Sequence, residues 1–418
     1  MKFKKKPVLF AVVLALLVIG VLELTLSLLA RVSPQVDRVL ASPWPSKETP
    51  HTLPDERLGY RPNPAYPGHD RLGFRNPDVP ARADIVVLGD SQTYGTGVAP
   101  AQAWPRQLAS MTGHIVYNMA YGGYGPAHRL MLWDEAVALQ PNLVIEAFYA
   151  GNDLFESFDL VYNRRQLSEL KSADPQLQAV VREAEQSEPI AERVSQMFRM
   201  GVQSAAASKA PTTAHPQRPS LRKLLSADSK LYGLLRRTQY EAVRLMDQLA
   251  HSPREQWEQA KAFAAANPAY CQVLSHGRLR TILTSEYRLS ALDLDDPRIA
   301  EGLQISLRSI HKMHELATAR NMRFLVLLVP TKETVFRNLG SHPAVSYRRL
   351  TDQEARFWAT TKAFLARRGI EYLDALPALQ GQLAAGVQPY PMSQDGHPNR
   401  HGHQAIAKLV ANHLSQPD

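Results

Sequence analysis

Residues 85–98 read Ile-Val-Val-Leu-Gly-Asp-Ser-Gln-Thr-Tyr-Gly-Thr-Gly-Val, an apolar run that ends in a Gly-Asp-Ser turn. The run from Ile85 to Leu88 is typical of a strand buried in a parallel sheet. Ser91 is therefore expected at the carboxyl end of that strand, the edge at which open α/β sheets bind ligands. The turn suits a nucleophilic serine, and the alternative is a plain helix N-cap formed by Asp90 or Ser91.

A second informative stretch lies near the C-terminus. Residues 395–403 read Asp-Gly-His-Pro-Asn-Arg-His-Gly-His and precede an amphipathic, helix-like segment. In an extended segment, residues two apart point to the same side. Asp395 can therefore hold His397 in one tautomer while His397 accepts the proton of Ser91, the arrangement of a serine nucleophile with an oriented base.

Two further predicted strand ends carry groups that can stabilise an oxyanion. Residues 115–117 are followed by the glycine-rich stretch 118–125, and residues 143–149 are followed by Gly-Asn-Asp at 151–153. A backbone N–H from the first turn and the Asn152 amide from the second are suitable donors to a developing negative charge.

With these four segments assembled, the chain resembles the SGNH (GDSL-type) hydrolase superfamily over about 80–155 and 290–418. The resemblance implies that Ser91 is the nucleophile and one oxyanion donor, Gly123 the second donor and Asn152 the third. It also implies Asp395 and His397 as acid and base. Two departures stand out: the family often places the Asp three residues before the His, and Ala120 occupies a position where glycine is frequent. Gly122 stays an alternative to Gly123.

Other segments are similar to a membrane-anchored bacterial subgroup associated with cell-envelope and exopolysaccharide functions. These segments are residues 54–60, 68–76 and 324–333. The last contains a predicted buried strand followed by Pro-Thr-Lys-Glu, which places Lys332 in a loop at the active-site edge. Lys332 is a candidate for binding an anionic group of the substrate, and the alternative is a solvated lysine or one paired with Glu333.

The N-terminus has the pattern of a signal anchor. Four lysines within residues 2–6 precede an apolar run from Val8 to Leu29, long enough to cross a bilayer. No convincing Ala-x-Ala cleavage site follows, so an uncleaved anchor is expected, with a cleaved signal as the alternative. The lysines orient the N-terminus toward the cytoplasm. The resulting expectation is a single-pass protein of the bacterial inner membrane with its catalytic domain in the periplasm.

Composition restricts the remaining possibilities. The 418 residues contain one cysteine, which excludes an intramolecular disulfide and a cysteine-based metal site. The net charge of +9 includes the lysines of the anchor flank, and the remaining excess suits anionic envelope polymers or phospholipid headgroups. No zinc-finger spacing or dense basic run indicates nucleic acid.

The predicted organisation has four parts. Residues 1–31 form the cytoplasmic tip and signal-anchor helix, and residues 32–80 an extended arm. The catalytic domain is discontinuous, comprising 81–155 and 291–418. Between its halves, residues 156–290 form a mainly helical insertion or cap with a mobile loop near 201–220. The expected fold class is α/β, a three-layer α/β/α flavodoxin-like fold with about five parallel strands, and the resemblance to the superfamily implies the strand order 2-1-3-4-5.

The predicted activity is that of a serine esterase acting through a Ser91 acyl-enzyme. The expected substrate and partner is an acylated carbohydrate or lipid of the envelope, with acetyl as the acyl group, and neither a cofactor nor a metal is expected. One alternative is an O-acyltransferase that modifies an exopolysaccharide with the same residues. The other is a non-catalytic glycan-binding scaffold of an envelope assembly, with protein partners left open.

Overall fold

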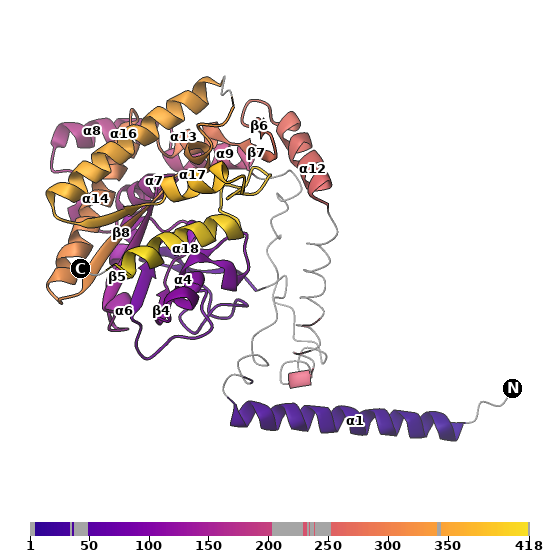
Figure 1. The fold of residues 1–418 in the computed structure, drawn as a ribbon. Helices are drawn as coiled ribbons and strands as arrows, with labels where there is room; N and C mark the ends of the chain where they lie inside the picture. Colours follow the sequence, from indigo (N-terminus) through magenta and orange to yellow (C-terminus); the bar gives the residue numbers. More distant parts are fainter. Residues whose placement is uncertain are drawn as a thin grey trace.

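The computed structural model describes residues 5–33, 36, 49–202, 229–231, 234, 238, 252–340 and 344–416. At its centre is a five-stranded sheet in the order β4-β3-β5-β8-β9, with every neighbouring pair parallel (Figure 1). The strands are β3 (Ile85–Leu88), β4 (Val116–Asn118), β5 (Leu143–Tyr149), β8 (Arg323–Val329) and β9 (Glu371–Asp374). Numbered along the chain, this order is 2-1-3-4-5, so the predicted α/β fold with a parallel five-stranded sheet is confirmed.

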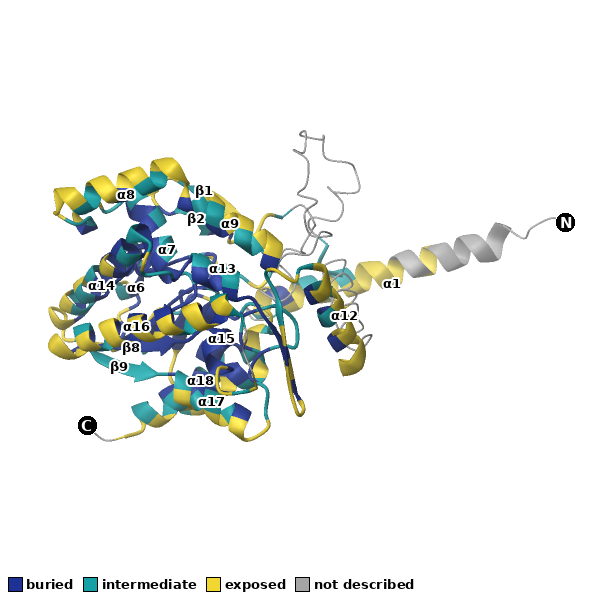
Figure 2. Ribbon diagram, turned by 90° about the horizontal axis from the view of Figure 1, so that it is seen from above, coloured by how far each residue is buried: buried dark blue, intermediate teal, exposed yellow. Residues whose placement is uncertain are grey.

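Helices cover both faces of the sheet. On one face lie α4 (Trp104–Thr112), α17 (Leu376–Ala384) and α18 (Arg400–Leu414); on the other lie α5 (Pro126–Met131), α6 (Trp133–Val137), α7 (Asp153–Phe158), α14 (Pro297–Thr318) and α16 (Val345–Arg367). Successive strand residues point to opposite faces, so Val86 packs with the second group and Val87 with the first. Figure 2 shows the buried sheet between helices with exposed outer surfaces. Both faces of β3, β5 and β8 are thus buried, which explains their continuous apolar sequences.

Short helical elements complete the body built around the parallel sheet. They are α3 (Ser91–Tyr94), η1 (Pro100–Gln102), η2 (Asp159–Asn163), η3 (Ser168–Leu170) and α15 (Lys332–Val335). Two of these, α3 and α15, directly follow the carboxyl ends of β3 and β8. They therefore lie at the edge of the sheet where the candidate catalytic residues were expected.

Where the structure describes it, the segment 156–290 contains helices and one β-hairpin. It contains α8 (Pro175–Ser187), α9 (Ile190–Gly201), α12 (Pro253–Ala266) and α13 (Ser285–Ser290). It also contains an antiparallel hairpin, β6 (Gln272–His276) and β7 (Leu279–Leu283), which was not predicted. Gly277 allows the tight turn, with φ +59°. The predicted mobile loop near 201–220 falls almost entirely outside the described residues.

The described part of the arm from residue 49 onward folds against the body built around the parallel sheet. A second antiparallel hairpin, β1 (Thr52–Asp55) and β2 (Gly59–Pro62), lies within it. Further along, the Arg75 guanidinium donates to the carbonyls of Gly95 and Val98 at 2.6 and 2.8 Å. These contacts fasten the arm to the turn that follows Ser91.

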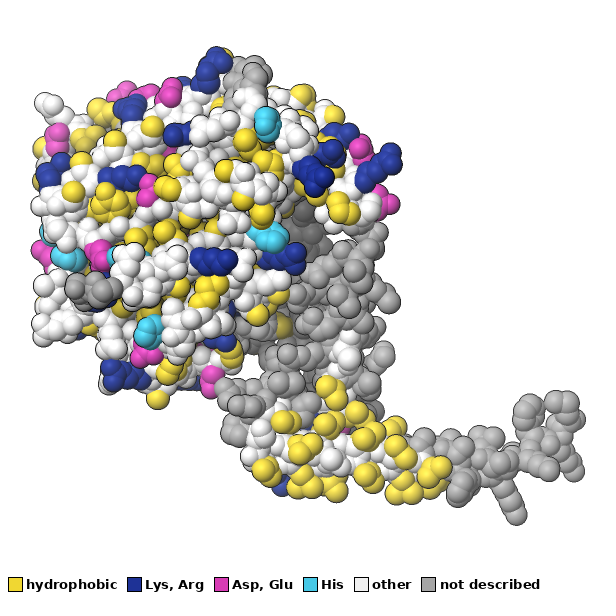
Figure 3. Space-filling model, in the orientation of Figure 1, with side chains coloured by type: hydrophobic (Ala, Val, Ile, Leu, Met, Phe, Trp, Pro, Cys, Tyr) yellow, Lys and Arg dark blue, Asp and Glu magenta, His cyan; other side chains and the backbone are white. Residues whose placement is uncertain are grey.

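Helix α1 (Lys5–Val32) contains the apolar N-terminal run. Several of its described side chains are exposed, including Leu17 and Leu24, and yellow apolar atoms are prominent on the part of the helix that is not grey (Figure 3). Within the part of the chain that the structure describes, no helix combines the length and the apolar character that a membrane span requires.

Candidate active site

Ser91 is the first residue of α3, directly after the buried strand β3. The Asp90 carboxylate caps this short helix by accepting from the backbone N–H of Gln92 at 2.9 Å. The helix ends after one turn at Gly95, whose φ of +85° is a left-handed conformation that favours glycine. Strand, cap and turn together fix the Ser91 hydroxyl at the edge of the sheet.

His397 and Asp395 meet Ser91 from a loop about 300 residues later. Nε2 of His397 lies 2.9 Å from Oγ of Ser91, and Nδ1 of His397 lies 2.6 Å from Oδ1 of Asp395. The same Oδ1 accepts the backbone N–H of His397 at 3.0 Å. Asp395 and His397 are joined by a tight turn, so an acid only two residues before the base is close enough to hydrogen-bond its ring.

The acid of this group is held in its charged form. Burial raises the pKa of Asp395, but the hydrogen bonds and charge of His397, together with Lys332, outweigh burial and lower the pKa to about 2. An ionised Asp395 orients the His397 ring and favours a proton on Nδ1, which leaves Nε2 free to accept the Ser91 proton.

The glycine loop after β4 lies beside Ser91. A Cβ built on Gly122 would be 3.6 Å from Cβ of Ser91. The Tyr60 hydroxyl donates to the Gly122 carbonyl at 2.9 Å, and because the peptide is trans, the N–H of Gly123 points to the opposite side. No described residue accepts from the N–H of Ser91, Gly122 or Gly123. These backbone donors are therefore available to a ligand.

Asn152 lies at the start of α7, after strand β5. Its backbone φ of −156° is not helical, and its side chain makes no capping hydrogen bond to the helix. Strands β3 and β5 are neighbours in the sheet, with Leu88 opposite Glu146. The turns that carry Ser91 and Asn152 consequently emerge at the same edge, and Glu156 of α7 contacts both Asn152 and the Gly123 position.

Lys332 does not have the role suggested by the sequence. Its side chain is fully buried, and Nζ donates to three carbonyl oxygens, those of Ile282, Ser393 and Asp395, at 2.6, 3.0 and 2.9 Å. An ammonium group has three N–H donors, so all of them are used. The predicted contact with an anionic substrate group is therefore corrected: Lys332 braces the loop that carries Asp395.

A buried ion network underlies the site and was not predicted from the sequence. The Arg129 guanidinium contacts Glu146 at 2.6 Å and Asp153 at 2.9 Å, and all three side chains are fully buried. Asp153 also accepts the backbone N–H of Tyr149 at 2.8 Å. This network fixes the turn that follows β5, in which Asn152 lies.

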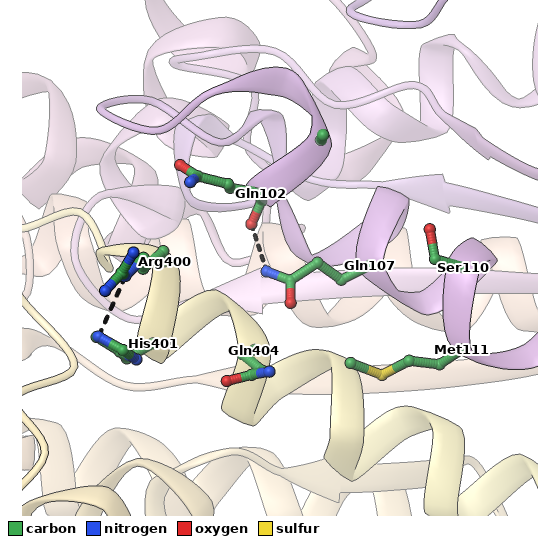
Figure 4. Close-up of a pocket in the computed structure, with 8 residues that line it drawn as sticks. Gln102, Gln107, Ser110, Met111, Arg400, His401 and Gln404 are labelled. Atoms are coloured by element: carbon green, nitrogen blue, oxygen red, sulfur yellow. Dashed lines mark hydrogen bonds between the residues drawn. The ribbon is translucent and has the colours of Figure 1, made fainter. Parts of the chain in front are cut away.

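A groove of about 500 Å³ lies elsewhere, between α4 and α18 (Figure 4). Its hydroxyl-bearing residue, Ser110, donates to the backbone carbonyl of Arg106 on its own helix at 3.0 Å. His401 contacts Arg400 and not the serine. The groove thus lacks a serine paired with a base, and the geometry favours the Ser91 edge as the active site.

Comparisons with known proteins agree with this geometry. Residues 87–267 match the model of the GDSL-like lipase/acylhydrolase family. That segment contains Ser91, Gly123 and Asn152, and it ends before Asp395 and His397. No curated protein matches the chain.

Solved structures of similar enzymes resemble the chain at low identity. An extracellular lipase from Streptomyces rimosus is 13% identical, with 80% of this chain and 100% of that chain covered and a TM-score of 0.37. A catalytic mutant of an acetylxylan esterase from Geobacillus stearothermophilus is 10% identical, with coverages of 81% and 97% and a TM-score of 0.34. A GDSL-like lipase from Bacteroides thetaiotaomicron is 11% identical, with coverages of 79% and 86% and a TM-score of 0.29.

Scores this low give no information about the substrate. The family match and the parallel sheet are independent of them. Over residues 87–267 the chain matches the GDSL-like lipase/acylhydrolase family, and this match supports a carboxylic ester hydrolase.

Proposed function

We propose that Ser91 is the nucleophile of this hydrolase, with His397 as general base and Asp395 as the group that orients it. The observation that carries the proposal is the continuous pair of contacts from Ser91 Oγ to His397 Nε2 at 2.9 Å and from His397 Nδ1 to Asp395 at 2.6 Å. These distances allow proton transfer from the hydroxyl to the ring and stabilisation of the resulting imidazolium.

The proposed reaction has two halves. Ser91 Oγ attacks the acyl carbonyl carbon while His397 takes its proton, and the negative charge on the carbonyl oxygen is stabilised by the N–H groups of Ser91 and Gly123 and by the Asn152 amide. His397 then protonates the leaving alkoxide as the acyl-enzyme forms. Water, deprotonated by His397, attacks the acyl-enzyme, and His397 returns that proton to Ser91 Oγ as the acid is released. In this scheme Gly122 is the alternative second donor.

The proposed substrate is an O-acyl ester, with acetyl as the acyl group, on a glycan or lipid of the cell envelope. Aromatic side chains of the arm support a sugar ring as the alcohol part. The Tyr60 hydroxyl donates to the Gly122 carbonyl of the glycine loop, and exposed His51, which contacts Tyr66, stacks on Tyr121 of that loop. Flat aromatic surfaces with a few polar groups are common in small-molecule sites.

Covalent labelling tests the nucleophile. Wild-type protein incubated with a fluorophosphonate should gain the mass of one phosphonyl group, and Ser91→Ala should gain none. Ser110→Ala is the matched control, because Ser110 is hydrogen-bonded to its own helix and should leave labelling unchanged. In parallel, Ser91→Ala should lower p-nitrophenyl acetate turnover by several orders of magnitude. Labelling of Ser91→Ala, or equal turnover, would refute the proposal.

The same reaction scheme extends to an acyltransferase if a sugar hydroxyl replaces water. The two outcomes are separated by supplying an acetyl donor with and without envelope oligosaccharides and measuring free acetate and acetylated sugar by mass spectrometry. Acetate release that no acceptor changes supports the esterase. Sugar acetylation that exceeds acetate release would replace it with the transferase.

We further propose that residues 8–29 anchor the protein in the inner membrane with the catalytic body in the periplasm. The support is the lysine cluster before an apolar run in the sequence. A C-terminal alkaline phosphatase fusion should be active and should stay in the membrane fraction after a carbonate wash. A soluble, shortened product would instead indicate a cleaved signal.

A further inference from the structure

The proposed catalytic scheme does not use Glu156, a partly buried carboxyl group beside the oxyanion donors. Glu156 lies one helical turn after Asn152 on α7, and its backbone N–H donates to the Asn152 carbonyl at 2.9 Å. Its side chain lies close enough to the Asn152 amide for that amide to lower the pKa of the Glu156 carboxyl group. From the other side, Oε1 of Glu156 is 3.5 Å from the position of a Cβ built on Gly123. One carboxyl group thus contacts two of the three turns that supply the proposed donors.

The contact with Asn152 has a directional consequence. An asparagine side chain ends in an oxygen and an NH₂ group, and only the NH₂ group can stabilise an oxyanion. The oxygen of the carboxyl group that carries no proton only accepts hydrogen bonds, in the neutral form as in the ionised form, so it pairs with the NH₂ end of Asn152. One N–H of that group then binds Glu156, and the second is left for the substrate oxygen.

We propose that Glu156 is a positioning residue that holds the Asn152 amide with its NH₂ group toward the oxyanion formed at Ser91. The inference rests on the proposed function, since it assumes that Asn152 is an oxyanion donor. It adds a residue that acts through Asn152 and not directly on the ester.

The charge of Glu156 matters because an ionised carboxylate opposes the charge that develops on the substrate. Several groups face it from the surrounding elements: Asn152 on α7, Asp159 and Arg164 at the ends of η2, Asp90 before α3, Tyr60 on β2 and Tyr287 on α13. Burial and the neighbouring Asp159 raise the pKa of Glu156 to about 8, against the lowering effects of the Asn152 hydrogen bond and Arg164. At neutral pH the group is therefore mainly uncharged, and its carbonyl oxygen still accepts from Asn152.

The direction in which kcat changes with pH follows from the raised pKa of Glu156. The active, neutral form dominates below about pH 8 and is lost as Glu156 ionises. For one group with a pKa of about 8, the neutral fraction falls about tenfold between pH 7 and pH 9. We expect kcat of the wild-type enzyme to fall by about that factor over the same range.

Substitutions at position 156 separate the role of Glu156 as a hydrogen-bond acceptor from the effect of its ionisation. Glu156→Gln keeps an acceptor for Asn152 without a titrating group, so kcat at pH 7 should stay within about threefold of wild type and the alkaline decline should disappear. Glu156→Ala removes the acceptor and should lower kcat about tenfold or more with little change in KM. Glu192→Gln, which removes an exposed acid of α9, is the control and should keep the wild-type profile.

A double-mutant cycle tests whether Glu156 acts through Asn152. In an Asn152→Ala background, Glu156→Ala should have no further effect on kcat, because the group that it positions is already absent. Thermal unfolding of each variant checks that the fold is retained. If Glu156→Ala alone fails to fold, the pH profile of Glu156→Gln still tests whether ionisation of Glu156 lowers kcat.

Different results would refute the Glu156 inference and the catalytic scheme on which it rests. An alkaline decline that persists in Glu156→Gln would overturn the proposal and would shift attention to Lys332, whose pKa burial lowers to about 8. Additive losses in the double-mutant cycle would also overturn it. Wild-type activity of Ser91→Ala would instead refute the catalytic scheme itself, so failure of the scheme and failure of the Glu156 inference are distinguishable.

Discussion

Replacing Arg129 with methionine should destabilise the protein strongly at neutral pH and much less at acidic pH. Arg129 is the cation of a fully buried network, 2.6 Å from Glu146 and 2.9 Å from Asp153. Methionine has a similar length and fills the space, but it leaves both carboxyl groups without a counter-ion. Breaking a buried ion pair by removing one partner typically costs about 3–5 kcal/mol.

The structure allows an independent estimate of this cost. A carboxyl group that loses its cation in the interior takes up a proton instead of staying charged. Protonating Glu146 at pH 7.5 against its ordinary pKa of 4.5 costs about 4 kcal/mol, and at pH 5.5 about 1.4 kcal/mol. Burial already raises the pKa of Glu146 and of Asp153 in the wild type, so part of this cost is present there. We therefore expect a loss of at least about 3 kcal/mol at pH 7.5, since Asp153 loses the same cation.

The sign of the pH dependence is fixed by these shifts. Carboxyl groups whose pKa is higher in the folded state than in the unfolded chain contribute their full stability at low pH and lose it as the pH rises. The difference in stability between wild type and Arg129→Met should therefore grow between pH 5.5 and pH 7.5. A second substitution, Glu146→Gln, should recover part of the loss at pH 7.5 because it removes one unpaired acid.

The assay is thermal unfolding of the full chain followed by tryptophan fluorescence at both pH values. A loss of about 3 kcal/mol corresponds to a decrease in Tm of about 5 °C for a domain of this size. A Tm within 2 °C of wild type at pH 7.5 would refute the reasoning. An equal decrease at both pH values would attribute the loss to packing and not to charge.

Three further substitutions test the site. Asn152→Ala should lower kcat on p-nitrophenyl acetate by about 10²–10³ with little change in KM; a change confined to KM would make Asn152 a substrate-binding residue. Gly123→Ala should reduce kcat by more than tenfold, because φ is +77° there and the new methyl group collides with the Tyr60 hydroxyl; Tyr60→Phe in the same chain should relieve part of the collision. Lys332→Met should lower both Tm and kcat by leaving three carbonyl oxygens unpaired; selective loss of activity on anionic esters would restore the substrate-binding role.

Local patterns predicted the framework of the fold well. The buried strands β3, β5 and β8 are continuous apolar runs, because helices cover both faces of the sheet and leave no polar face to encode. The hairpin formed by β6 and β7 was missed, since the helix-favouring composition of residues 156–290 outweighed the turn signal at Gly277. Composition over a long segment averages out such short elements.

Residues of the site differ in how far sequence alone could identify them. Ser91, Asn152 and His397 each follow a strand or precede a helix in a recognisable short motif, and the structure places Ser91 and His397 in contact. Glu146 carried a signal that went unused: a charged residue inside an apolar strand requires a buried partner. Nothing local indicated that the partner is Arg129, because the two side chains meet only after β5 and α5 have packed together.

The sequence by itself determined the parallel α/β sheet, the strand order that its family resemblance implied, and the motif that places Ser91 at the edge of the sheet. These properties depend on local periodicity and on residues close together in the chain. Only the tertiary structure decided that the three donors of Lys332 are taken by carbonyl groups, that Tyr60 of the arm contacts the glycine loop, and that Glu156 lies between Gly123 and Asn152. Each of these arrangements joins segments distant in the chain, and their distances and burial are set by packing, which a one-dimensional pattern does not contain.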